Sequence, residues 1–149
     1  MRPEETVDYH IKSSWHSISR MYNQLASSYN LTQAAGYVLM MIDEDEGTHV
    51  TKIGPMLGME PTSMTRLLKS LEEDGLIYRI KEEGDKRKVK ICLTKDGHVK
   101  RKLIRKVVRR FNDRILNEIG KHEFDAFKEV ILKVHEIAEE YKKLSIENI

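Results

Sequence analysis

Apolar side chains recur at spacings of three and four residues along most of this chain, a periodicity typical of amphipathic helices. The first stripe predicts one long helix from about Glu4 to Ser28, ended by Asn30. A second helix is expected to begin near Thr32, a favourable N-cap residue, and to reach Ile42. The first stripe consists of Val7, Ile11, Trp15, Ile18, Tyr22, Leu25 and Tyr29.

The middle of the chain predicts two more helices, joined by a turn at Gly58-Met59. The shorter one covers roughly Val50 to Leu57, and Gly54-Pro55 within it predicts an irregular helix, because proline removes a backbone hydrogen bond. The other begins at Pro61, where a missing N–H costs nothing, and ends at Gly75. Its apolar face consists of Met64, Leu67, Leu68 and Leu71.

Beyond Gly75 the pattern changes from helical spacing to alternation, which predicts a β-hairpin. Its strands are Leu76–Lys81 and Lys88–Leu93, and residues 82–87 form a polar turn. A hairpin rich in Lys and Arg beside a helix with a polar face is typical of a wing that lies along duplex DNA.

Two long helices complete the chain, one from Lys95 to Ile119 and one after Gly120. The first divides lengthwise into an apolar half and a basic half, and we expect the basic half to be solvated. The two ends of the chain offer more apolar surface than a small central lobe can cover, so a second copy of the chain is expected to cover it. The basic half comprises Arg101, Lys102, Arg105, Lys106, Arg109 and Arg110. The last helix carries Phe124, Phe127, Val130, Ile131, Val134, Ile137, Ala138 and Tyr141.

Composition limits the class of protein. A chain of 149 residues is expected to form one domain with its own core. It has no apolar run of roughly 20 residues that would span a bilayer, and its polar N-terminus does not resemble a signal peptide. One cysteine excludes an internal disulfide framework. These features predict a cytoplasmic protein with no membrane partner.

The net charge of +2 conceals a strong separation along the chain. Residues 1–51 carry −4, residues 52–114 carry +9 and residues 115–149 carry −3. The helix that begins at Pro61 and the hairpin, where phosphate groups would be neutralised, both lie inside this positive segment. The predicted DNA-binding side chains are Thr62, Ser63, Thr65, Arg66 and Lys69 of the helix, and Asp85, Lys86, Arg87 and Lys88 of the hairpin. Arg87 is expected to enter the minor groove, oriented by Asp85.

Motifs for catalysis are lacking, so no enzyme activity, cofactor or metal site is predicted. The sequence contains no Gly-rich phosphate loop, no GxSxG and no HExxH, and its six histidines are scattered. The acidic pair Glu72-Glu73 is interpreted as solvated surface. Cys92 is interpreted as a small strand residue, although its lysine neighbours leave a redox role open.

The segment from residue 58 to residue 97 resembles the signature of the MarR family of bacterial transcription regulators. The matching residues are Gly58, Thr65-Arg66, Leu71-Glu72, Gly75-Leu76-Ile77, Arg79, Asp85, Arg87, Leu93-Thr94 and Gly97. The resemblance implies a mainly α fold with a small β-hairpin wing, in which a winged helix-turn-helix lobe is flanked by long dimerisation helices. It places the DNA-binding lobe at residues 31–97 and the dimerisation helices at 1–30 and 98–149 of a single domain, 1–149.

The same resemblance implies a homodimeric repressor of a pseudo-palindromic operator, released by a small apolar or aromatic effector. The effector site would lie among the first, second and fifth helices. Its candidate residues are Trp15, His16, Arg20, Tyr37, Met40 and Met41, although Trp15 also fits a place in the core. A winged-helix module that binds proteins without reading DNA is the alternative, because a fold does not determine function. The operator, the regulated genes and the effector are not specified by the sequence.

Overall fold

The computed structural model describes residues 2–82 and 85–143, with backbone alone for residues 82 and 85–88. The chain divides into two compact units, one up to Lys106 and one from Val107 onward. The boundary falls within one long helix, and each unit is described separately below. Among the residues described, no helix is both long enough and apolar enough to cross a membrane.

The first unit opens with the 3-10 turn η1 (Pro3–Glu5) and the long helix α1 (Val7–Ser27). The turn occupies the start of the segment predicted to be helical, so α1 begins three residues later than expected. Helix α2 (Gln33–Met41) follows. The Thr32 hydroxyl accepts the Ala35 N–H at 3.1 Å, which confirms the predicted N-cap.

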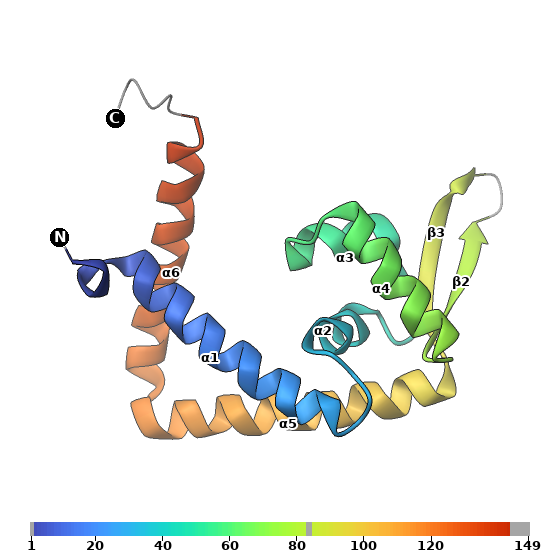
Figure 1. The fold of residues 1–149 in the computed structure, drawn as a ribbon, viewed down its shortest axis with the longest axis horizontal. Helices are drawn as coiled ribbons and strands as arrows, with labels where there is room; N and C mark the ends of the chain where they lie inside the picture. The colour runs from blue at the N-terminus through green and yellow to red at the C-terminus, as the bar shows by residue number, and fades with distance from the viewer. Residues whose placement is uncertain (1, 83–84, 144–149) are drawn as a thin grey trace. The chain divides into compact units, whose positions relative to one another are not determined.

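Helices α3 (Val50–Leu57) and α4 (Pro61–Glu73) form the predicted helix-turn-helix (Figure 1). Gly58 ends α3 in the left-handed region at φ 59°, which lets the chain reverse sharply into α4. Pro55 lies within α3, yet the helix is continuous, so the irregularity predicted from Gly54-Pro55 is not seen.

Three antiparallel strands form the wing sheet in the order β1-β3-β2. Strands β2 (Ile77–Glu82) and β3 (Asp85–Leu93) are the predicted hairpin, although β3 begins three residues earlier than expected. Strand β1 (Thr48–His49) was not predicted. It pairs Thr48 with Ile91 and thereby joins the loop after α2 to the sheet.

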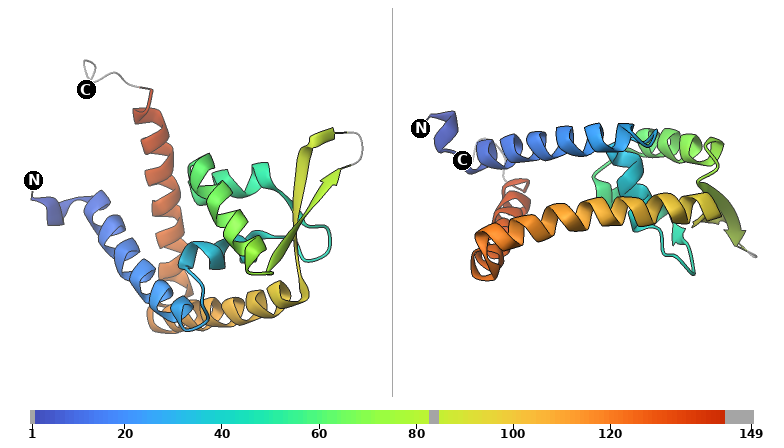
Figure 2. Two further views of the ribbon diagram at one scale, coloured as in Figure 1. Left: turned by 45° about the vertical axis from the view of Figure 1, so that its right-hand side comes forward. Right: turned by 90° about the horizontal axis from the view of Figure 1, so that it is seen from below.

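A single hydrophobic core joins α2, α3, α4 and one face of the sheet. Val38, Leu39, Ile42, Ile53 and Ile91 are completely buried within it. The first turns of α5 (Lys95–Ile119) also pack here, through Ile104. Figure 2 shows these elements from two further sides.

The second unit consists of the rest of α5 and the helix α6 (Lys121–Tyr141). Gly120 separates the two helices at φ 84°, as the sequence predicted. None of the residues of α6 is buried, and Phe127, Val130 and Tyr141 each expose more than half of their surface. Helix α1 of the first unit likewise has no buried residue. Both helices therefore present apolar faces that the described chain leaves open.

Candidate nucleic-acid interface

Helix α4 has one buried face and one polar, exposed face. Met64, Leu68 and Leu71 keep at most 3% of their surface exposed and anchor the helix to the core. The exposed face carries the five side chains predicted from the sequence, namely Thr62, Ser63, Thr65, Arg66 and Lys69. Because the buried side chains fix the rotation of the helix, these five side chains all face solvent.

Local contacts leave most of this polar face available. The Thr65 hydroxyl donates to the Pro61 carbonyl at 2.9 Å, so it keeps acceptor capacity for a donor on a base. Lys69 lies 3.7 Å from Glu73, but both side chains are mostly exposed, so this pair is worth little. Breaking this ion pair so that Lys69 can bind a phosphate therefore costs little free energy.

An ion pair that the sequence interpretation missed joins α4 to the wing. Arg79 Nε of β2 donates to Glu72 Oε2 at 3.0 Å, and both side chains are partly shielded. Glu72 is exposed, as its assignment to surface predicted, and it is in addition an ion-pair partner of the hairpin. Helical periodicity could not predict this contact, because Glu72 lies in α4 and Arg79 lies in β2.

The end of α4 is also bonded to the start of α5. The Thr94 hydroxyl donates to the Gly75 carbonyl at 2.6 Å and accepts the Gly97 N–H at 3.0 Å. A Cβ at Gly97 would lie 2.0 Å from the Leu76 carbonyl oxygen, so only glycine permits this close approach. These contacts explain why Leu93-Thr94 and Gly97 belong together in the signature.

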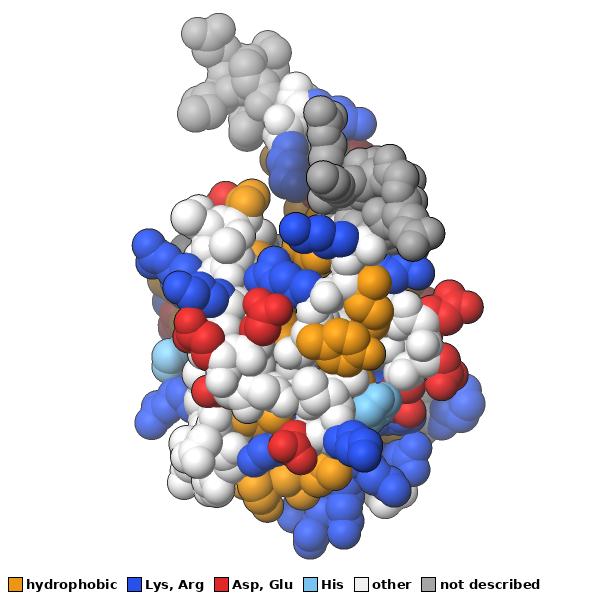
Figure 3. Space-filling model, turned by 90° about the vertical axis from the view of Figure 1, so that its right-hand side faces the viewer, with side chains coloured by type: hydrophobic (Ala, Val, Ile, Leu, Met, Phe, Trp, Pro, Cys, Tyr) orange, Lys and Arg blue, Asp and Glu red, His pale blue; other side chains and the backbone are white. Residues whose placement is uncertain are grey.

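The wing presents two faces of different character. Ile77, Ile91 and Leu93 turn inward and are buried. Cys92 is also buried, as expected for a small strand residue. Tyr78 and Ile80 are 46% and 44% exposed. On the side of the molecule that carries the wing, Lys and Arg side chains stand beside exposed apolar ones (Figure 3). The side chains of Asp85, Lys86, Arg87 and Lys88 lie outside the described residues, so their predicted roles stay predictions.

A cavity of about 460 Å³ adjoins α1, α2 and α3. Trp15 and Tyr37 stack across its edge with ring centroids 6.4 Å apart, and Met41 also lines it. The structure thus brings together three of the six predicted effector residues. His16, Arg20 and Met40 are not part of its lining. The remaining lining residues are Gln33, Ala34, Met56, Leu57 and Met59.

The cavity is bounded by α3 and the turn after it, and α5 contributes none of its lining residues. The effector site predicted among the first, second and fifth helices stays a prediction. Trp15 is 52% exposed in the single chain, so it is not a core residue of the lobe. Met56 and Met59 were overlooked because their contact with the cavity depends on how α3 packs, which periodicity does not report.

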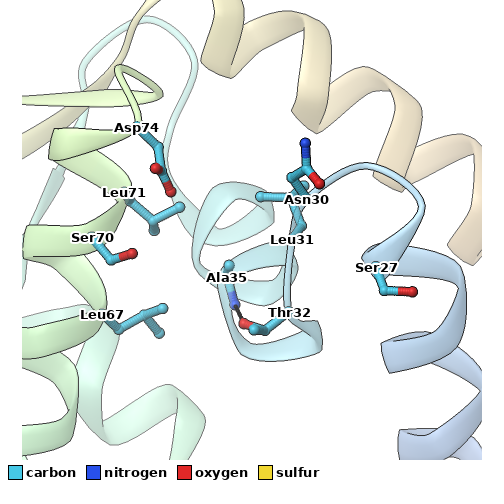
Figure 4. Close-up of a pocket in the computed structure, with 9 residues that line it drawn as sticks. All are labelled: Ser27, Asn30, Leu31, Thr32, Ala35, Leu67, Ser70, Leu71 and Asp74. Carbon is cyan, nitrogen blue, oxygen red and sulfur yellow. Dashed lines mark hydrogen bonds between the residues drawn. The ribbon is translucent and has the colours of Figure 1, made fainter.

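A second cavity, of about 320 Å³, lies behind the polar face of α4 (Figure 4). Leu67, Ser70 and Leu71 of α4, together with its C-cap residue Asp74, line one side of it. The segment that joins α1 to α2 lines the other side, through Asn30, Leu31 and Thr32. Among the described residues, no cluster of His, Cys, Asp and Glu could hold a metal ion at either cavity.

Comparisons with known proteins show which family has this architecture. The profile described as "MarR family" matches residues 31–89, which cover α2 through most of β3. The HTH-type transcriptional regulator SarZ from Staphylococcus aureus (strain USA300) is 31% identical over 109 residues, or 73% of this chain and 71% of SarZ. The chain belongs to the MarR family. It is therefore a DNA-binding transcription regulator with a winged helix-turn-helix, and MarR proteins are not enzymes.

Solved structures show the same fold. The S. aureus MepR–DNA complex has a TM-score of 0.81 at 20% identity, over 88% of this chain and 97% of that one. The transcriptional repressor CouR bound to a 23-mer DNA duplex has a TM-score of 0.77 at 25% identity, over 89% and 94%. CouR from Rhodococcus jostii RHA1 bound to p-coumaroyl-CoA has a TM-score of 0.79 at 18% identity, over 90% and 94%. The MarR fold thus extends over the long helices as well as the lobe.

Proposed function

We propose that this MarR protein is a homodimeric repressor that occupies a two-fold symmetric operator and leaves it when a small apolar ligand binds. The observation that carries the proposal is the division of α4 into a buried apolar face and an exposed polar face. A helix held in this way can present side chains to base edges in the major groove. CouR, a repressor bound to a DNA duplex, supports repression as the mode of action.

The dimer is supported by the open apolar faces of the long helices. Val7, Ile11, Trp15 and Leu25 of α1 are each at least 39% exposed, although they form one continuous stripe. A second copy of the chain would remove this surface from water. In this proposal residues 1–30 and 98–149 form the dimerisation helices, residues 31–97 form the DNA-binding lobe, and 1–149 is one domain.

DNA contacts are assigned to two elements. Thr62, Ser63, Thr65, Arg66 and Lys69 of α4 meet the major groove, where hydroxyl and cationic groups recognise base edges and phosphates. The wing residues Asp85, Lys86, Arg87 and Lys88 meet the backbone, and Arg87 enters the minor groove.

The effector site is assigned to the cavity beside Trp15, Tyr37 and Met41. Its lining is mainly aromatic and methionine side chains, which suit an apolar or aromatic ligand. Binding there would lower DNA affinity only if the ligand prefers the conformation that does not bind DNA. The structure of CouR with p-coumaroyl-CoA supports ligand control in this fold.

Fluorescence anisotropy with labelled duplexes at several salt concentrations tests DNA reading. We expect the logarithm of the binding constant to fall linearly with the logarithm of salt concentration, and one duplex sequence to be favoured over its scrambled version. Equal affinity for all duplexes, or no binding at low salt, would refute the proposal.

A protein-interaction role without sequence-specific DNA binding is the second candidate. The exposed Tyr78 and Ile80 on the wing favour it, because apolar side chains on a strand suit a protein partner. This candidate predicts that a Tyr78→Ser and Ile80→Ser double variant binds DNA as the wild type does. It also predicts that wild-type protein shows no preference among duplexes.

A further inference from the structure

The first turns of α5 contain a cation that is not solvated, contrary to the sequence expectation for the basic half of that helix. The side chain of Arg101 is only 13% exposed. Its Nε donates to the Leu39 carbonyl at 3.0 Å, and its Nη2 donates to the Met40 carbonyl at 3.2 Å. Both carbonyls lie in the last turn of α2, where no helical N–H is available to them. Arg101 therefore caps the C-terminal end of α2, which also carries the negative end of the helix dipole.

Glu44 completes this arrangement from the loop after α2. Its carboxylate pairs with Arg101 Nη1, and it also lies 3.2 Å from Arg105 Nη1, one helical turn further along α5. Burial lowers the pKa of Arg101, the neighbouring Arg105 lowers it further, and Asp43 opposes this shift. Removing the Glu44 carboxylate would leave the shielded Arg101 guanidinium without its anionic partner.

The end of α2 is connected in turn to the DNA-binding elements. Asp43 N donates to the Thr48 hydroxyl at 2.9 Å, and that hydroxyl donates to the Met41 carbonyl at 3.3 Å. Thr48 belongs to β1, which pairs with Ile91 of the wing, and α3 begins directly after β1. The segment that Arg101 holds is therefore the point from which both the sheet and the helix-turn-helix depart.

We propose that Arg101 is a positioning residue for DNA binding: it fixes the end of α2 and the loop at Glu44 against α5, and so sets the placement of α4 and the wing without contacting DNA itself. The inference rests on the DNA-binding activity of the family. Arginine is required because its planar guanidinium donates to two carbonyls and forms an ion pair with a carboxylate at once, whereas a lysine ammonium on a flexible stem cannot reproduce that fork.

The neighbouring residue supplies a matched control. Lys102 lies on the same turn of α5 and is exposed, and its replacement by glutamine removes the same charge. We expect Arg101→Gln to weaken binding to the preferred duplex by about tenfold or more, because hydrogen bonds of a charged group are lost. We expect Lys102→Gln to change it less than about threefold, as for one screened surface charge. Arg101→Lys should restore only part of the affinity.

Salt dependence separates positioning from direct contact. A residue that neutralises a phosphate contributes about one unit to the slope of log affinity against log salt concentration, whereas a positioning residue contributes none. We therefore expect Arg101→Gln to lower affinity at every salt concentration with an unchanged slope. A reduced slope would show that Arg101 touches DNA, and an equal effect of Lys102→Gln would show that only net charge matters. Either result would overturn the proposal.

Glu44→Gln provides a test that keeps the arginine and its carbonyl bonds. Removing a negative charge from a DNA-binding protein should by itself tighten binding. The positioning role predicts the opposite sign, namely weaker binding by about threefold or more, because the loop loses its charged anchor. Glu46→Gln, an exposed residue of the same loop, is the control and should bind equally or slightly more tightly. Tighter binding by Glu44→Gln would contradict the proposal.

Thermal unfolding of each full-length variant accompanies the binding measurements. A variant that is fully folded at the assay temperature yet binds weakly supports positioning. If Arg101→Gln and Glu44→Gln lose affinity only in proportion to the unfolded fraction, the role of the cluster is merely structural and the proposal fails.

Discussion

The winged lobe and the long helices use the same kind of apolar side chain in opposite ways. In the lobe, Leu39, Ile42 and Ile53 are fully enclosed by neighbours from the same chain. In α1 and α6, each of 21 residues, no residue is fully buried. Burial within the chain thus explains the stability of the lobe, whereas the helices need surface from elsewhere to remove their stripes from water.

The largest difference between the two regions is expected when one side chain in each is truncated. Leu68→Ala removes a buried side chain of α4, and we expect the free energy of unfolding to fall by about 2–5 kcal/mol. Val130→Ala on the exposed face of α6 should cost much less in dilute protein. Urea titration measures both, and equal losses at all protein concentrations would contradict the distinction.

Placing a charge on the exposed face of α6 sharpens the argument for a second copy. We expect Phe127→Asp to weaken self-association by at least about 2 kcal/mol, because a charge would be buried at an interface. Light scattering at micromolar concentration should report a dimer for the wild type and mainly monomer for the variant. If the variant is still a dimer, α6 is not part of the interface. If the wild type is a monomer, the proposed dimer is wrong.

The two faces of α4 offer a comparison within one helix. Arg66→Ala on the exposed face should cost about 1–3 kcal/mol of DNA-binding energy and relax the preference at one base position per half-site. Its unfolding midpoint should stay that of the wild type. Lys69→Ala, as a phosphate contact, should weaken all duplexes alike. Identical base preferences in wild type and Arg66→Ala would show that another side chain reads that position.

The smallest effect is expected from the surface charges of the second unit. Lys121 and Lys128 hydrogen bond to Asp125 and lower its pKa to about 2. A carboxyl with a lowered pKa stabilises the folded state above its unfolded pKa of about 3.9, and this contribution is lost as the pH falls toward 2. Asp125→Asn should therefore slightly flatten the acid side of the stability curve, measured by thermal unfolding between about pH 2 and pH 5. A large change at neutral pH would be unexpected, because these side chains are exposed.

The sequence predicted what depends on local periodicity and failed where distant segments meet. The helices and the polar face of α4 follow from spacing, because 3.6-residue periodicity is visible in the chain itself. The Thr32 cap follows from its residue type, because a threonine hydroxyl can accept a backbone N–H at the start of a helix. Strand β1 was missed because two residues carry no alternation and become a strand only by pairing with β3.

Arg101 was assigned to solvent for a related reason. A helical wheel gives the direction of a side chain but not what lies opposite it, and the carbonyls it binds are about sixty residues earlier in the chain. The cavity beside Trp15 likewise includes Met56 and Met59 of a different helix. The sequence thus predicted the individual elements, but it did not predict the contacts between them.

Selection of bound sequences from a random duplex DNA library by the purified full-length protein tests the central claim most directly. A symmetric dimer that presents two α4 helices should recover an inverted repeat whose half-site centres lie about one helical turn, roughly 10 base pairs, apart. Recovery of a single, non-repeated motif would contradict the dimeric reading of DNA. Recovery of no enriched sequence would contradict sequence-specific binding altogether.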